Sequence, residues 1–207
     1  MNIPEARRPL ASRSTRWAGF LSTAAIRAGF TADGISLLSL LVAAAGAAAL
    51  LLLPRPWNLL GCAAGIQLRL LCNLLDGMVA IEGGKKSKVG VLYNEVPDRL
   101  ADSMFLVALG YEIGTPWVGW LAALAAAVTA YIRVLGGTFG LAQDFRGPLA
   151  KQHRMFVMTL GCLLGIGEYC YDGGERILIA AAWIIAFGAI ATCGTRVRAI
   201  ARQLKAR

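Results

Sequence analysis

Charged residues are scarce in this chain of 207 residues, where Asp, Glu, Lys and Arg make up 16% and hydrophobic residues 57%. That balance is too apolar for an ordinary soluble domain. Histidine occurs once, at His153, so histidine-based acid–base chemistry is poorly supported. The five cysteines lie in or beside apolar segments without metal-type spacing, which argues against a disulfide framework. We also expect no secretory signal peptide, because the first 30 residues are arginine-rich and lack a compact apolar core.

Two apolar runs are long enough to cross a membrane. Residues 35–53 are 19 positions without a charge, and residues 177–193 are a further 17. Pro54-Arg55-Pro56 and Gly114-Thr115-Pro116 interrupt the pattern where helices would end. We therefore predict an all-α integral membrane protein with six transmembrane helices, without an internal repeat or a second domain. The predicted spans lie at about 32–53, 57–81, 91–112, 116–140, 153–170 and 176–195.

An amphipathic helix is predicted over residues 13–30, ahead of the first span. Its apolar residues recur at helical spacing, which is typical of a helix lying in the membrane interface, and a span follows directly. That interpretation is favoured over a soluble surface helix. Thr31 is placed to cap the span. The predicted organisation is a tail with an interfacial helix (1–30), a six-span domain (31–195) and a basic tail (196–207). The apolar face of the interfacial helix comprises Trp17, Phe20, Leu21 and Ala24.

The net charge of +9 gathers at the ends of the predicted spans. Sixteen of the 21 Lys and Arg residues fall on one side of the six-span topology and two on the other. The positive-inside rule then places both termini and the loop at 82–88 in the cytoplasm. We expect a multi-pass protein of the cytoplasmic membrane whose basic ends contact anionic lipid, and no nucleic-acid partner.

Four oxygen-bearing side chains flank that loop within apolar, helix-like sequence. If the two flanks are antiparallel helices, Asp76 faces Asp98, and Asn73 faces Asp102. Acidic groups that converge in an apolar setting repel one another and lose hydration, so they need a cation. Hard oxygen ligands suit Mg²⁺, Mn²⁺ or Ca²⁺. The alternative is a structural polar cluster in which Asp98 pairs with Arg69 or Arg99. Because so many carboxylates within a membrane segment are unfavourable unless they serve a function, we favour a functional site over a structural cluster.

The stretch Asn73-x-x-Asp76-Gly77-x-x-Ala80, followed by Asn94-x-x-x-Asp98-x-x-x-Asp102, resembles the signature of the CDP-alcohol phosphotransferases. That signature is D-x-x-D-G-x-x-A-R, a spacer, then G-x-x-x-D-x-x-x-D. This chain looks most like a bacterial subgroup with Asn at the first position.

The resemblance implies transfer of a phosphatidyl-type group from a CDP-alcohol, above all CDP-diacylglycerol, to an alcohol acceptor, with release of CMP in phospholipid biosynthesis. It also implies a homodimer and two divalent ions, Mg²⁺ or Mn²⁺. Asp102 would be the general base, and Gly77 and Ala80 would let the nucleotide lie against the helix. The implied metal ligands are Asn73, Asp76, Asp98 and Asp102.

The chain departs from the family pattern at three positions. Asn73 replaces an Asp, Ile81 replaces an Arg, and Asn94 replaces a Gly. Glu95 lies on the same helical face as Asp98 and would supply the carboxylate that is missing at Asn73. Alternatively, Glu95 is a solvated acid at the start of a helix. The missing cation would come from Lys85, Lys86 or Lys88. These departures keep two alternatives open, a degenerate non-catalytic homologue that binds metal or nucleotide, and a divalent-cation transporter.

Three basic residues beyond the pattern are candidates for contacts to the acceptor or to phosphate. Arg133 lies within the fourth predicted span and should face the interior of the helix bundle. Lys151 and Arg154 belong to a basic cytoplasmic connection, where the family resemblance implies binding of an acidic acceptor such as a polyol phosphate. Contact with lipid headgroups is the competing interpretation for both.

Overall fold

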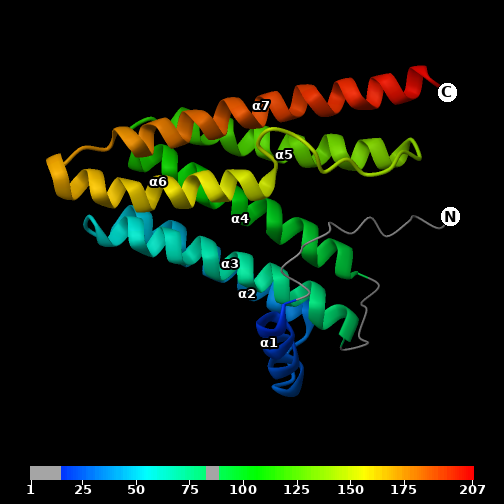
Figure 1. Ribbon diagram of the computed structural model, residues 1–207, viewed down its shortest axis with the longest axis horizontal. Helices are drawn as coiled ribbons and strands as arrows, with labels where there is room; N and C mark the ends of the chain where they lie inside the picture. Colours follow the sequence, from blue (N-terminus) through cyan, green and yellow to red (C-terminus); the bar gives the residue numbers. More distant parts are fainter. Residues whose placement is uncertain (1–14, 83–88) are drawn as a thin grey trace.

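Within residues 15–82 and 89–207, which the computed structural model describes, the chain forms seven helices and no strand. Six helices are long and run side by side, and the short α1 projects from one side of them (Figure 1). The all-α prediction is confirmed. The helices are α1 (Arg16–Arg27), α2 (Ala32–Leu52), α3 (Trp57–Glu82), α4 (Gly90–Glu112), α5 (Pro116–Thr138), α6 (Lys151–Asp172) and α7 (Arg176–Lys205).

Local sequence explains where the helices begin and end. Thr31 Oγ1 accepts a hydrogen bond from the Gly34 backbone N–H at 3.1 Å and so caps α2, as predicted. Pro116 opens α5, where its missing N–H is harmless, and Gly173, at φ 72°, ends α6 in the left-handed conformation. The predicted limits differ most at the C-terminal end, because α7 continues to Lys205 through most of the expected tail.

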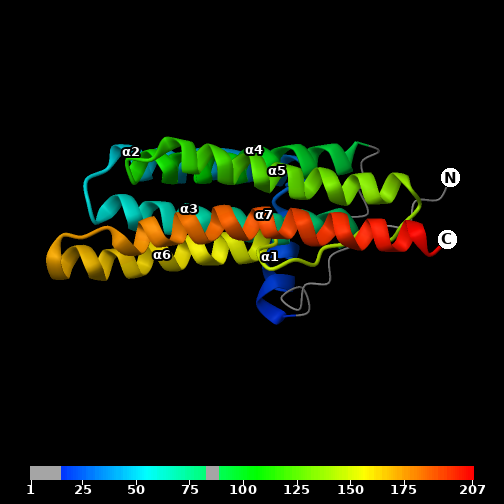
Figure 2. The ribbon, with the colours of Figure 1, turned by 90° about the horizontal axis from the view of Figure 1, so that it is seen from above.

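The long helices form two layers, which Figure 2 shows from above. One layer contains α2, α4 and α5, and the other contains α3, α6 and α7. The closest packing joins α2 to α3, α2 to α4, and α4 to α5, whereas α3 and α4 barely approach each other within the described residues. We expected the helices that flank 83–88 to face each other directly. Instead, α2 packs on both, and polar side chains span the space between α3 and α4.

Paired glycines allow the closest helix contacts. A Cβ added to Gly65 of α3 would lie 2.7 Å from the Cα of Gly46 on α2. A Cβ added to Gly119 of α5 would lie 2.9 Å from the Cα of Gly110 on α4. Small residues at helix interfaces let backbones approach and gain dispersion contacts, which is how helices associate in a membrane. The position of α4 between its neighbours is therefore set by packing rather than by the site.

Four helices in the described parts of the chain, α2, α3, α5 and α7, are long and apolar enough to cross a membrane. Neither α4 nor α6 meets that standard, because both carry charged residues of the site described below, including Asp98 and Asp102 on α4 and Arg154 on α6. The helices are those of a membrane protein, as predicted.

The amphipathic character of α1 is visible in its packing. Ala18 and Ser22 are buried against α3, and Ser22 Oγ donates a hydrogen bond to Glu82 at 2.6 Å. Trp17 and Phe20, from the predicted apolar face, remain 50% and 73% exposed. The outward surface of α1 thus combines large apolar side chains with Arg16 and Arg27, and its position in the membrane interface stays a prediction.

An ion cluster joins three helix ends at the opposite end of the bundle from Asp98. Arg55 Nη2 lies 3.0 Å from Glu112 and 2.9 Å from Glu175, and Asn58 donates to Glu112 at 2.8 Å. The cluster links the start of α3 to the end of α4 and the start of α7.

Candidate active site

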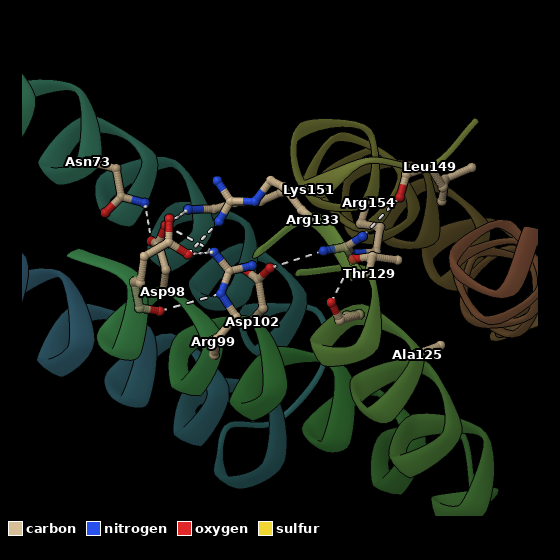
Figure 3. Close-up of polar contacts among 12 residues, drawn as sticks. Asn73, Asp98, Arg99, Asp102, Ala125, Thr129, Arg133, Leu149, Lys151 and Arg154 are labelled. Carbon is tan, nitrogen blue, oxygen red and sulfur yellow. Dashed lines mark hydrogen bonds and ion pairs between the residues drawn. The ribbon is translucent and has the colours of Figure 1, made fainter. Parts of the chain in front are cut away.

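Asp98, on α4, is bound from two other helices (Figure 3). Its Oδ1 accepts hydrogen bonds from Arg69 Nη2 at 3.0 Å and from Asn73 Nδ2 at 2.9 Å, both on α3. Lys151 Nζ, from the first turn of α6, pairs with Oδ2. Two of the predicted metal-ligating residues, Asn73 and Asp98, therefore contact each other directly.

Asp102, one turn further along α4, is buried and lies between two arginines. Its Oδ1 lies 2.9 Å from Arg69 Nη2, and its Oδ2 lies 3.3 Å from Arg154 Nη2. Arg154, on α6, also donates to the Leu149 carbonyl oxygen at 2.9 Å. The guanidinium of Arg69 thus contacts both Asp98 and Asp102 and offsets the repulsion between them.

Asp76 lies one turn beyond Asn73 on α3 but binds α2. Its Oδ2 accepts a hydrogen bond from the Ser36 hydroxyl at 2.8 Å, and Ser39 donates to the Ser36 carbonyl oxygen at 2.8 Å. Asp76 Oδ1 is buried without a hydrogen-bond partner among residues 15–82 and 89–207. An unsatisfied buried carboxylate oxygen is unfavourable, so this atom marks a place where a cation would be stabilised.

Glu95 is directed toward α5 and away from the other acids. Its Oε2 lies 2.9 Å from Arg99 and 2.6 Å from Arg133, and Arg133 also donates to Gln143 at 3.0 Å. The Arg133 guanidinium stacks on Phe145, 5.0 Å from the ring centre. For Glu95 to replace the carboxylate lost at the first metal position, its ion pairs would have to break. Its compensating role therefore stays a prediction.

The other predicted positions lie along α3 and beyond it. Gly77 and Ala80 are half-buried, one and four residues after Asp76, and their contact with a nucleotide stays a prediction. Ile81, where the family pattern has an arginine, is 44% exposed. The lysines proposed to replace that arginine lie outside the described residues; they are Lys85, Lys86 and Lys88.

The connection between α5 and α6 is docked on α7, which fixes the first turn of α6. Leu149 N–H donates to Thr192 Oγ1 at 3.0 Å, and a Cβ on Gly147 would lie 2.3 Å from the Thr192 side chain. Within the connection, burial favours a raised pKa of Asp144, but hydrogen bonds from Arg146 outweigh burial and lower that pKa. Asp144 stays ionised and pairs with Arg146. Lys151 and Arg154 therefore start from an anchored segment.

Asp76 and Asn73 offer oxygen ligands that would suit a divalent ion. Among residues 15–82 and 89–207, no three His, Cys, Asp or Glu side chains are grouped closely enough to bind a metal. Asp98 and Asp102 are engaged by cationic side chains, whereas Asp76 keeps an unpartnered Oδ1. Asn73 uses its amide nitrogen toward Asp98, which leaves its amide oxygen for coordination. Carboxylate and amide oxygens suit Mg²⁺ and Mn²⁺, so the choice of metal stays open.

Two residues of the site were underestimated from sequence. Arg69 entered only as a structural partner for Asp98, yet it is fully buried and also binds Asp102. Arg69 lies four residues before Asn73 and therefore on the same helical face, so its spacing in the sequence already indicated that it lies near the site. Ser36 carried no such signal, because α2 reaches Asp76 only through tertiary packing.

The fold and this acidic site between α3 and α4 agree with the resemblance of the sequence pattern to the CDP-alcohol phosphotransferases. Within that class, its homologues are phosphatidylinositol phosphate synthases. The chain is 26% identical over 183 residues to that of Mycobacterium marinum, with 85% of this chain and 76% of the relative covered. It is 27% identical over 197 residues to that of Streptomyces avermitilis, with 91% and 78% covered. No family model matches the chain. The Asn-containing subgroup stays a prediction.

Solved structures show the same fold. The chain superimposes on Mycobacterium tuberculosis phosphatidylinositol phosphate synthase with CDP-DAG bound at a TM-score of 0.76 and 22% identity, covering 90% of this chain and 94% of the other. A second structure of that enzyme, in complex with manganese and citrate, gives a TM-score of 0.76 at 21% identity, covering 88% of each chain. The arrangement of the helices is therefore that of a known enzyme fold.

Proposed function

We propose that this protein transfers a phosphatidyl-type group from a CDP-alcohol, above all CDP-diacylglycerol, to an alcohol acceptor and releases CMP in phospholipid biosynthesis. One observation carries the proposal: α3, α4 and α6 bring Asn73, Asp98 and Asp102 together with Lys151 and Arg154 in one buried site. Acidic oxygens bind a divalent metal, and basic side chains bind phosphate. A relative of the same fold holds CDP-DAG, and the same relative holds manganese in another structure.

The acidic side chains and Asn73 have separate roles in the proposed reaction. Asp76 and Asn73 would hold the metal, with Asp98 and Asp102 completing the acidic site. Asp102, which lies between two arginines, accepts the proton of the acceptor hydroxyl as general base. A bound divalent ion would supply Lewis-acid charge to the phosphoryl oxygens.

Lys151 and Arg154 are the best-placed phosphate contacts. Each lies on α6 and reaches an acidic side chain of α4, so a substrate phosphate at that point would meet both. Arg133 is already paired with Glu95, and we assign it to holding the α4–α5 contact. The basic end of the bundle favours an acceptor that itself carries a phosphate, the kind of substrate that the name of the relatives indicates.

The test is metal-dependent release of CMP from CDP-diacylglycerol by the purified protein in detergent, measured with inositol phosphate, glycerol phosphate and unphosphorylated inositol as acceptors. We expect release with a phosphorylated acceptor in Mg²⁺ or Mn²⁺. Asp102→Asn should lower the rate about 10²–10⁴-fold because it removes the base without changing the shape of the side chain. Asp144→Asn, in the anchored connection, is the matched control. Wild-type turnover in Asp102→Asn would refute the base assignment.

A non-catalytic homologue is the second candidate, because four basic side chains already pair with Asp98 and Asp102: Arg69, Arg99, Lys151 and Arg154. Absence of CMP release with every acceptor, in protein that still binds CDP, would favour it. A cation transporter needs a polar path to the other membrane face. The outer halves of α3 and α4 contain the fully buried apolar residues Leu59, Phe105 and Leu106, which argue against such a path.

The membrane arrangement completes the proposal. Six spans, an interfacial α1 and cytoplasmic termini agree with the alternating direction of the helices and with the lysine and arginine asymmetry. On α6, Phe156, Leu160, Leu163 and Leu164 are exposed, as a lipid-facing surface would be. Cysteines at Ser87 and Thr115 should be labelled from opposite sides of the membrane. A homodimer, like the assignment of 31–195 as the catalytic domain, is part of the proposal by family resemblance.

A further inference from the structure

Arg69 is a cation built into the acidic site. Its side chain is 0% exposed, and Nη2 lies 3.0 Å from Asp98 Oδ1 and 2.9 Å from Asp102 Oδ1. The same nitrogen donates to the Asp98 carbonyl oxygen at 3.2 Å. Because it is buried and bound to the backbone as well as to two carboxylates, this guanidinium belongs to the scaffold that joins α3 to α4.

The acidic residues around Arg69 carry one negative charge fewer than the four aspartates of the family pattern. In the pattern, four aspartates match the four positive charges of two divalent ions. Here Asn73 carries no charge, and the Arg69 guanidinium lies against Asp98 and Asp102. The remaining carboxylates, on Asp76, Asp98 and Asp102, carry three negative charges. Arg69 balances one of them, and a single divalent ion balances the other two.

The contacts also point to one position for the ion. The oxygens of Asp98 and Asp102 nearest Arg69 already face its guanidinium, so a cation there would be repelled at short range. Two buried carboxylate oxygens, Asp76 Oδ1 and Asp102 Oδ1, have no hydrogen-bond partner within the described parts of the chain. Arg69 Nη2 lies 2.9 Å from Asp102 Oδ1, whereas Asp76 Oδ1 offers a ligand that Arg69 does not use. The ion therefore belongs on the Asp76 side.

Lys151 and Arg154 differ from Arg69 in the number of carboxylates that they contact, although Arg154 is also buried and donates to a backbone carbonyl oxygen. Each makes one carboxylate contact, and both come from α6 rather than from the helix that carries Asn73 and Asp76. The diphosphate of a CDP-alcohol carries two negative charges, which these two side chains would match on substrate binding. If Lys151 and Arg154 bind the substrate, Arg69 and one divalent ion balance the negative charges of the three aspartates.

We propose that this chain binds one divalent ion where the family pattern binds two, and that Arg69 permanently takes the place of the second ion's charge. The proposal rests on the proposed function, since ion and diphosphate would share this site. It assigns Arg69 a positioning role, because the side chain touches the acids and no reacting atom.

The experiment counts Mn²⁺ ions bound per chain in the purified protein with CDP, by electron paramagnetic resonance and elemental analysis. We expect one ion in the wild type and in Arg69→Lys, which keeps the charge. Arg69→Met combined with Asn73→Asp should bind two ions. Arg55→Met, which removes a partly buried ion-paired arginine at the opposite end of the bundle, should still bind one.

The wild-type count decides the matter even if the double variant does not fold. Two ions in the wild type would overturn the single-ion proposal and leave the transferase proposal intact. No bound Mn²⁺ in the presence of CDP would overturn both. A double variant that folds but still binds one ion would show that Arg69 and Asn73 do not set the number, and would also overturn it.

Discussion

Replacing Ser36 by alanine should weaken metal binding although Ser36 touches no metal. Its hydroxyl donates to Asp76 Oδ2 at 2.8 Å, and Asp76 Oδ1 has no other hydrogen-bond partner among the described residues. Ser36→Ala would therefore remove the hydrogen bond that α2 donates to this buried carboxylate. A hydrogen bond to a charged group is worth about 1.5–3 kcal/mol, or roughly a 10- to 150-fold change in an equilibrium constant. Loss of a residue that orients a metal ligand lowers affinity by about 10- to 100-fold, which agrees.

The measurement is the Mn²⁺ dissociation constant of each variant by calorimetry, at fixed CDP. Ser39→Ala is the matched control, because Ser39 is equally buried on α2 and donates only to the Ser36 carbonyl oxygen. Ser36→Thr keeps the hydroxyl and should restore most of the affinity. Affinity within about twofold of wild type in Ser36→Ala, or an equal loss in Ser39→Ala, would refute the orienting role of the Ser36 hydroxyl.

Two further predictions concern the site's departure from the pattern and the packing of the bundle. If Glu95 compensates for Asn73, Glu95→Gln should reduce CMP release strongly and Asn73→Asp should recover part of the loss in the double variant; wild-type activity of Glu95→Gln would show that Glu95 only holds Arg133. Gly65→Leu should lower stability in detergent by about 1–3 kcal/mol, because its Cβ would meet α2. Gly167→Leu, where an added Cβ has no neighbour within 4 Å, should leave the unfolding temperature unchanged.

The helices and the main functional class could be predicted from sequence because they depend on local pattern. Apolar runs interrupted by proline and glycine place the helix ends, and Thr31 caps α2 as expected. The spacing of Asp98 and Asp102 puts both on one face of α4 whatever lies opposite. The CDP-alcohol phosphotransferase resemblance rests on such short-range spacing, and the homologues agree with it.

Only the tertiary structure decided which charges meet. From sequence, either Arg69 or Arg99 could pair with Asp98. In the structure Arg69 lies 3.0 Å from Asp98 and 2.9 Å from Asp102, whereas Arg99 lies 2.9 Å from Glu95 and only 3.9 Å from Asp98. A side chain's helical face can be read from periodicity, but its partner depends on the direction and separation of the neighbouring helices. Here glycine contacts hold α2 against α3, and the space left between α3 and α4 is one that a long guanidinium can span. The sequence determined that several carboxylates share this membrane bundle; packing determined which cation balances them.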